Sequence, residues 1–460
     1  MRTRCRCPSK TVGEGTDQTG MDSRFLTLWR TVLLLTVASC TSTSPQEQGN
    51  HYLIDVRLDP PRGLIDASVD LSLLSASDGA TTVLFWLHRQ LEIDTVHGPL
   101  VAGYELDLEP VDHLPWMPEA GELRVHLVRP LVEGELIDLH FEYRGNVDTW
   151  PEWSANVITD DWTEIGLYLP WFPYNYDDYA PFTYELDVRI DDEYVVRGLG
   201  DAERTNDGWH LEWNQPTNDV VVVASRDLRS VRAEREGHTV QVHFTTLDDS
   251  VAVRIGEDVV TMLQTYARWF GESDQANLAL VESKRERGGG YARRGLIVLG
   301  QLSFLMVPEE RANYVRYLAH ESAHGWWNQA PADGWDDWLN ESFAEYSALL
   351  VVRDRLGDEE FAARLDEKRR ASEGTPTIWH LARSDVSTEE KAREVNQVLY
   401  SKGPILLDEL ADRVGLEAFL DWCRRLVQLE IGSTEEALDV LADLEGEPTS
   451  RWFRQLLMTR

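Results

Sequence analysis

The stretch Leu318–Glu345, LAHESAHGWWNQAPADGWDDWLNESFAE, decides how the chain is interpreted. It opens with a His-Glu-x-x-His pattern formed by His320, Glu321 and His324. Residues four apart lie on one face of an α-helix, so a helix over residues 311–324 would present both imidazoles to a single cation, with Glu321 beside a metal-bound water. Apolar residues at helical spacing line one side of this segment, and no Pro or Gly interrupts it. The alternative is a chance match between two core histidines.

A third ligand follows at Glu341, in the sequence Trp-Leu-Asn-Glu. A catalytic zinc takes three protein ligands and keeps one open position, and Glu341 can supply the third from a second helix that begins near Asn340. Glu345 falls one turn later on the same face, where it can accept the other ring N–H of a ligand histidine. The alternative for Glu345 is a solvated carboxylate on the helix surface.

Another pattern, Tyr-Ser-Lys-Gly, begins at Tyr400. A tyrosine hydroxyl is a hydrogen-bond donor that can stabilise an oxyanion. A half-buried aromatic residue without a chemical role is the alternative.

The three patterns, in this order, resemble the M1 family of zinc aminopeptidases, which are gluzincins with a thermolysin-like catalytic domain. The resemblance implies one zinc ion bound by His320, His324 and Glu341. It also implies that Glu321 is the general base and proton shuttle, and that Tyr400 stabilises the tetrahedral intermediate. The segment between His324 and Glu341 is two residues shorter than the family pattern.

The resemblance breaks where the family has a Gly-x-Met-Glu-Asn strand, whose Glu binds the free amine of the peptide. The corresponding residues here are Gly289, Gly290, Tyr291, Ala292 and Arg293. Ala292 stands at the Glu position and Arg293 at the Asn position, which predicts altered recognition of the N-terminus. The glycines permit close backbone approach, which favours an edge strand that binds a peptide by strand addition; a flexible surface loop is the alternative. A second amine anchor of the family corresponds to Glu164, which is also consistent with a charge on a strand surface.

The composition indicates a folded, acidic protein. Its 460 residues are 42% hydrophobic and 10% aromatic, enough for a sizeable core and two or three domains. A formal net charge of −36 argues against nucleic-acid binding, because phosphate neutralisation needs Lys and Arg. Cys423 has no evident disulfide partner, and we predict that it is a small buried apolar residue of a helix.

Residues 1–40 have the layout of an export signal, with basic residues, the apolar run Val32–Val37 and then small residues before Cys40. The apolar run is too short to span a bilayer. Its end resembles a bacterial lipobox, which implies that Cys40 is diacylated and anchors the protein to a membrane of the cell envelope. An ordinary cleaved signal is the alternative. Residues 41–50 then form a flexible polar tether.

The remaining chain predicts an α+β fold with two domains. Apolar and polar residues alternate over 65–73 and 182–190, which is typical of half-buried strands, so residues 51–235 are predicted to form an N-terminal β-sandwich like that of the M1 family. Residues 236–460 are predicted to form a thermolysin-like zinc-metallopeptidase catalytic domain. The boundary is placed in the charged run 232–238. After Tyr400, helical patterns cover residues 404–414, 416–431, 434–444 and 451–457.

Three functions are consistent with these observations. The first is an exported zinc aminopeptidase of M1 type that acts on peptides. The second is a metallo-endopeptidase, because the amine-binding carboxylate is missing at Ala292. The third is a non-catalytic peptide-binding envelope protein on the same scaffold, against which the retained Glu321 and Tyr400 argue.

Overall fold

The computed structural model describes residues 49–109, 117–151, 156–175, 181–273, 277–285, 289–300, 302, 307–332, 334–382, 386 and 389–459. The predicted signal segment with Cys40, and all of the predicted tether except Gly49 and Asn50, lie outside these ranges. In the described part of the chain, no helix is long and apolar enough to cross a membrane.

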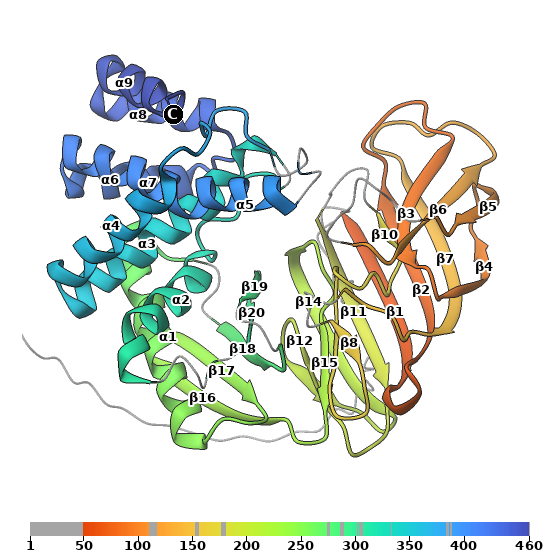
Figure 1. Ribbon diagram of the computed structural model, residues 1–460. Helices are drawn as coiled ribbons and strands as arrows, with labels where there is room; N and C mark the ends of the chain where they lie inside the picture. Colours follow the sequence, from red (N-terminus) through yellow and green to blue (C-terminus); the bar gives the residue numbers. More distant parts are fainter. Residues whose placement is uncertain are drawn as a thin grey trace, which may run out of the picture. The chain divides into compact units, whose positions relative to one another are not determined.

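The first domain consists of strands in three sheets (Figure 1). Its strands are β1 Asn50–Asp59, β2 Leu64–Leu74, β3 Thr82–His88, β4 Glu92–His97, β5 Val101–Asp107, β6 Ala120–Leu127, β7 Leu136–Asn146, β8 Val157–Ile158, β9 Thr163–Ile165, β10 Tyr174–Asn175, β11 Phe182–Arg189, β12 Val195–Gly198, β13 Ala202–Arg204, β14 Gly208–Thr217 and β15 Val222–Ser225. The sheet orders are β13-β14-β11-β1-β2-β7-β4, β10-β3-β6-β5 and β12-β15-β9-β8.

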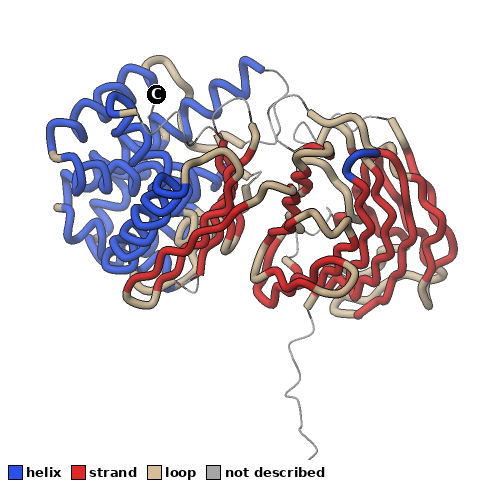
Figure 2. The backbone as a smooth tube through the Cα atoms, turned by 90° about the horizontal axis from the view of Figure 1, so that it is seen from below, coloured by secondary structure: helices blue, strands red, loops and turns tan. Residues whose placement is uncertain are grey.

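The strands predicted from alternation are present as β2 and β11, with every second side chain buried. Residues from all three sheets share one apolar core. A short 3₁₀ turn, η1 (Pro60–Arg62), interrupts the strands where the sequence has a Pro-Pro turn signal, and Figure 2 shows it as a small helical segment among strands. The predicted sheet-rich first domain is therefore confirmed.

A fourth sheet, with parallel and antiparallel pairs, begins the next domain. Its strands are β16 Arg229–Arg235, β17 His238–Phe244, β18 Asn277–Ser283, β19 Gly290–Arg293 and β20 Leu296–Gly300, in the order β16-β17-β18-β20-β19. The charged run predicted to be a domain boundary is the β16–β17 hairpin instead, so this sheet already begins at Arg229. The charges are tolerated because β16 is an edge strand whose side chains are mostly exposed.

The two faces of this sheet contribute to different cores. Val281 and Val298 pack with the apolar core of the first domain, whereas Leu280 and Leu299 pack with that of the helices. Neighbouring residues of a strand point to opposite faces, so the near-continuous apolar runs of β18 and β20 follow from burial on both sides.

Helices complete the second domain. They are α1 Asp249–Phe270, α2 Arg311–Ala323, α3 Trp338–Leu356, α4 Asp358–Ser372, α5 Glu389–Gln397, α6 Gly403–Val414, α7 Leu416–Gln428, α8 Thr434–Glu445 and α9 Glu447–Leu457, with short 3₁₀ turns η3 Pro308–Glu310 and η4 Trp335–Asp337 and a π-helix, η6 Val398–Lys402. Cys423 is a buried free thiol on α7, as predicted. The predicted helices of the C-terminal region are present as α6 to α9, and α2 and α3 carry the two predicted metal-ligand patterns.

Candidate active site

Three potential ligand side chains converge from α2 and α3. Nε2 of His320 lies 3.5 Å from Oε2 of Glu341, and Nε2 of His324 lies 3.8 Å from the same oxygen. One ligand atom of each residue lies within 4.8 Å of the others. Zinc–ligand bonds of about 2.0–2.1 Å at tetrahedral angles separate the ligand atoms by about 3.4 Å. The residues therefore fit one ion of this size, and no other group of His, Cys, Asp and Glu in the described ranges meets the same condition.

The second ring nitrogen of each histidine faces an oxygen atom, which aims Nε2 at Glu341. Nδ1 of His324 donates to the backbone carbonyl of Trp327 at 3.0 Å. Nδ1 of His320 lies 2.9 Å from Oε2 of Glu345. Such bonds fix the tautomer and the orientation of a metal-binding imidazole, so both rings are oriented for metal binding.

Glu345 is the centre of a buried ionic network. The side chain is 0% exposed, Arg316 donates to both of its oxygens at 2.8 and 2.9 Å, and Lys368 forms a further ion pair. Burial raises the pKa of Glu345, but Arg316, Lys368 and His320 outweigh burial and hold the pKa well below its usual range. Glu345 is thus placed as the carboxylate that orients His320 and not as a solvated helix residue.

The acid–base properties of the cluster suit a metal-dependent base. Burial lowers the pKa of His320, but hydrogen bonds to Glu341 and Glu345 outweigh it and raise the pKa to about 10. A cation at this position would displace that proton. Burial also raises the pKa of Glu321, against the opposing effect of His320 and His324. A carboxylate with a raised pKa is better matched to proton transfer near neutral pH.

Tyr400 lies on the π-helix η6, and its ring centroid is 5.6 Å from that of His320. π-Helical turns are frequent at functional sites, where they re-aim a side chain. The hydroxyl of Ser342, next to Glu341, donates to the carbonyl of Leu399 at 2.7 Å and joins α3 to this turn. The structure therefore brings Tyr400 to the metal-ligand cluster.

Three residues of this site were not predicted. Asn340 bonds both the N–H and the carbonyl of Ala330 and fixes the loop before α3. Arg316 lies one helical turn before His320, a spacing that could have indicated its shared partner. Lys368 comes from α4, and no local pattern connects it with either ligand helix.

The predicted substrate-binding residues divide into two groups. β19 is an edge strand, as predicted, and Ala292 faces the core that contains α2. An added Cβ at Gly290 would overlap the carbonyl of Val298, so this glycine is required by pairing with β20. Gly289 has a positive φ of 112° at the entrance to the strand.

The other group is buried against the first domain. Glu164 is 0% exposed and accepts hydrogen bonds from Ser283 at 2.6 Å and from Tyr291 at 3.2 Å. Arg293 is 11% exposed and pairs with Asp219 at 2.7 Å. That Glu164, Tyr291 and Arg293 contact a peptide stays a prediction. In this structure Tyr291 donates to Glu164 itself, and Arg293 pairs with Asp219, all in buried positions.

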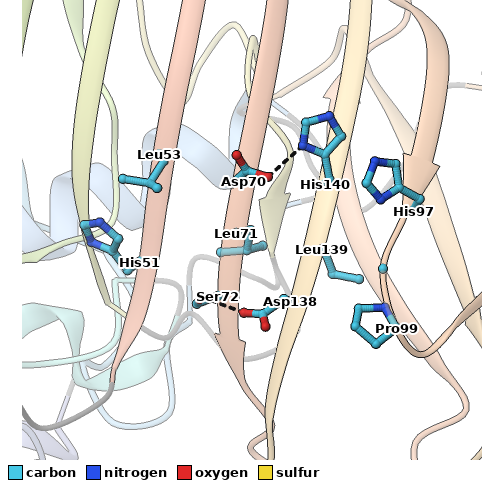
Figure 3. Close-up of a pocket in the computed structure, with 11 residues that line it drawn as sticks. His51, Leu53, Asp70, Leu71, Ser72, His97, Pro99, Asp138, Leu139 and His140 are labelled. Atoms are coloured by element: carbon cyan, nitrogen blue, oxygen red, sulfur yellow. Dashed lines mark hydrogen bonds and ion pairs between the residues drawn. The ribbon is translucent and has the colours of Figure 1, made fainter.

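A separate depression of about 280 Å³ lies on the exposed face of the sheet β1-β2-β7-β4 (Figure 3). His140 bonds Asp70 at 2.7 Å there and stacks on His97 with 4.5 Å between ring centroids. These histidines are engaged with neighbouring side chains and do not converge on one point as His320 and His324 do.

This site is that of a metal-dependent hydrolase of the His-Glu-x-x-His class. It combines two histidines, a carboxylate from a second helix and the nearby Glu321. Residues 259–449 match the Peptidase family M1 domain. This part of the chain is an M1 peptidase domain, and its metal-ligand cluster is that of a metallopeptidase.

Solved structures share the fold over most of the chain. An M1 zinc metallopeptidase mutant from Deinococcus radiodurans, bound to a Tyr-Ser-Ala substrate, is 19% identical with a TM-score of 0.66, over 90% of this chain and 95% of that one. A two-domain M1 zinc metallopeptidase mutant bound to L-tryptophan gives the same values. The M1 zinc metallopeptidase from Deinococcus radiodurans is 18% identical with a TM-score of 0.66, over 89% and 94%. None of the curated proteins compared with the chain matches it.

Proposed function

We propose that this protein is a zinc-dependent aminopeptidase with altered recognition of the peptide N-terminus. The observation that carries the proposal is the convergence of His320, His324 and Glu341 at separations that suit one tetrahedral ion. The match to the M1 domain and the likeness to structures described as zinc metallopeptidases support zinc as that ion.

The roles of the residues follow from their positions. His320, His324 and Glu341 would hold the ion, which when bound supplies a Lewis acid for the scissile carbonyl and for water. Glu321 takes the proton of the attacking water and passes it to the leaving amine. The hydroxyl of Tyr400 donates to the oxyanion of the tetrahedral intermediate.

Peptide binding is assigned to the edge strand β19, beside α2. An edge strand can bind an extended peptide by strand addition, and the backbone at Gly289 and Gly290 lies at its start. Ala292 offers no charge to an ammonium group, and Glu164 is already bonded within the interface. The N-terminus of the peptide is therefore recognised without a carboxylate at position 292. Because this carboxylate is missing, endopeptidase activity is the second candidate function.

Fluorogenic peptides with free and with acetylated N-termini, assayed with and without a chelator, test the proposal. Chelator-sensitive hydrolysis of the free peptides supports an aminopeptidase, and equal hydrolysis of the acetylated peptides supports an endopeptidase. We expect Glu321→Gln to abolish turnover while zinc analysis still finds bound metal. The exposed Glu309, just before α2, provides the matched control Glu309→Gln. No hydrolysis by metal-replete protein across a broad panel would instead favour a peptide-binding protein.

We also propose that the protein is exported and anchored in the cell envelope by a lipid on Cys40. The signal-like residues 1–40 support this proposal. Cys40→Ala should move the protein from the membrane fraction to the soluble fraction. Retention of the variant in the membrane fraction would argue against the lipid.

A further inference from the structure

A buried lysine connects two parts of the site that the metal cluster does not join directly. Lys368 of α4 is 13% exposed and forms an ion pair with Glu345. Its Nζ also donates to the backbone carbonyl of Tyr400 at 2.7 Å. One ammonium group therefore contacts both the carboxylate that orients His320 and the turn that carries the tyrosine.

Arg316 provides the comparison. Both of its bonds to Glu345, at 2.8 and 2.9 Å, neutralise the same carboxylate from α2. Of the two cations, only Lys368 bonds the backbone of Tyr400 among the contacts seen in the described residues. Charge neutralisation of Glu345 is thus shared, whereas the connection to η6 belongs to Lys368.

The local geometry explains why such a connection is useful. Tyr400 lies on a π-helical turn, whose position depends on packing against other elements. α4 packs against both α3 and η6. Burying an ammonium group is costly unless it is paired and hydrogen-bonded, so Lys368 has one well-defined position, and the groups that it bonds are held relative to one another.

We infer that Lys368 is a positioning residue that couples the orientation of His320, through Glu345, to the position of Tyr400. The inference rests on the proposed function, since it concerns the placement of a metal ligand and of an oxyanion donor. The ring centroids of His320 and Tyr400 are 5.6 Å apart. Lys368 holds this spacing through its contacts with Glu345 and with the backbone carbonyl of Tyr400.

A double-mutant cycle in the full chain tests the coupling. Lys368→Met should lower kcat about 10–100-fold in the wild-type background, with KM nearly unchanged, because a displacement of about 1 Å costs this much. In a Tyr400→Phe background the same substitution should cost less, leaving only the loss through Glu345 that it shares with Arg316→Met. Arg316→Met is the matched control and should lower kcat equally in both backgrounds. An equal loss from Lys368→Met in both backgrounds would overturn the inference.

Two measurements do not depend on turnover. Zinc affinity, from competition with a chelator, should fall about 10-fold or more in both Lys368→Met and Arg316→Met, because both loosen the partner of His320. Amide hydrogen exchange at Val398–Lys402 should rise in Lys368→Met only. Unchanged exchange there refutes the connection to Tyr400, even if the protein hydrolyses no peptide and the proposed function fails. Lys368→Arg keeps the charge and provides a folded variant in which protection should be partly retained.

Discussion

Replacing Gly403 by alanine tests how Tyr400 is positioned. An added Cβ would lie closer than 3.0 Å to both Oγ and Cβ of Ser342, which is closer than real Cβ atoms approach their neighbours. Gly403 is the first residue of α6, directly after η6, so reaching an ordinary contact of about 3.5 Å requires α3 to separate from this junction by about 1 Å. The Gly of the Tyr-Ser-Lys-Gly pattern thus permits close packing between the helix bearing Glu341 and the turn bearing Tyr400.

The expected cost follows from two effects. Overpacking costs about 1–3 kcal/mol, and loss of the hydrogen bond from Ser342 to Leu399 costs about 0.5–1.5 kcal/mol. We therefore expect the free energy of unfolding of Gly403→Ala to fall by about 2–4 kcal/mol. If the variant folds, displacement of Tyr400 by about 1 Å should lower kcat about 10–100-fold.

Urea unfolding and steady-state kinetics measure both effects. Ser342→Gly removes the two atoms that the new methyl group would overlap, so it should restore much of the stability when combined with Gly403→Ala. The single variant Ser342→Gly is the control, since it loses the hydrogen bond without the overlap. Wild-type stability and kcat in Gly403→Ala, or no rescue in the double variant, would refute the reasoning.

Three further predictions concern the metal, the domain interface and pH. Removal of zinc by a chelator should lower the thermal midpoint of unfolding, because an ion bound by Glu341 and the histidines stabilises the folded state only. Differential scanning fluorimetry measures this midpoint. Asp219→Ala should cost about 3–5 kcal/mol in urea unfolding, because Arg293 stays buried without its anion, and adding Arg293→Met should recover part of the loss. The wild type should lose about 3 kcal/mol of stability relative to His88→Gln as the pH falls from about 6.5 to 4.

The sign of the pH effect follows from the buried, neutral His88. Its Nδ1 accepts from the N–H of Gln90, and its Nε2 donates to the carbonyl of Thr149. Burial lowers its pKa from 6.5 to about 4, so the unfolded chain binds a proton that the folded chain rejects. The contribution is complete above pH 6.5 and is lost as the pH falls through this window. Parallel pH profiles of wild type and His88→Gln would contradict this assignment. An unchanged thermal midpoint after zinc removal would contradict the metal prediction, and an Asp219→Ala variant as stable as the wild type would contradict the interface prediction.

Local patterns predicted the elements that carry the site. A spacing of four residues places His320, in the last turn of α2, and His324, at its C-cap, on one face, whatever surrounds the helix. Period-2 alternation likewise predicted β2 and β11. The charged run at 232–238 lies in the β16–β17 hairpin, and the sequence did not reveal β16, because an exposed edge strand has too few buried side chains to display the alternation.

Partner choice could not be predicted in the same way. The sequence suggested that the Arg293 side chain could contact a substrate. In the structure it forms a buried ion pair with Asp219, which is far away in the sequence. Glu164 likewise bonds Ser283 and Tyr291, which lie on strands β18 and β19 of the second domain. The sequence shows that these side chains are charged or polar, but it does not show which side chains they contact in the folded protein.

The sequence by itself determined the two ligand helices, the identity of the donor atoms and the presence of a base and a tyrosine, because these depend on residue type and helical spacing. The tertiary structure alone decided that Lys368 meets both Glu345 and Tyr400, and that Gly403 lies against Ser342. Such contacts join residues from different elements, so they exist only after packing has set the distances between α3, α4 and η6.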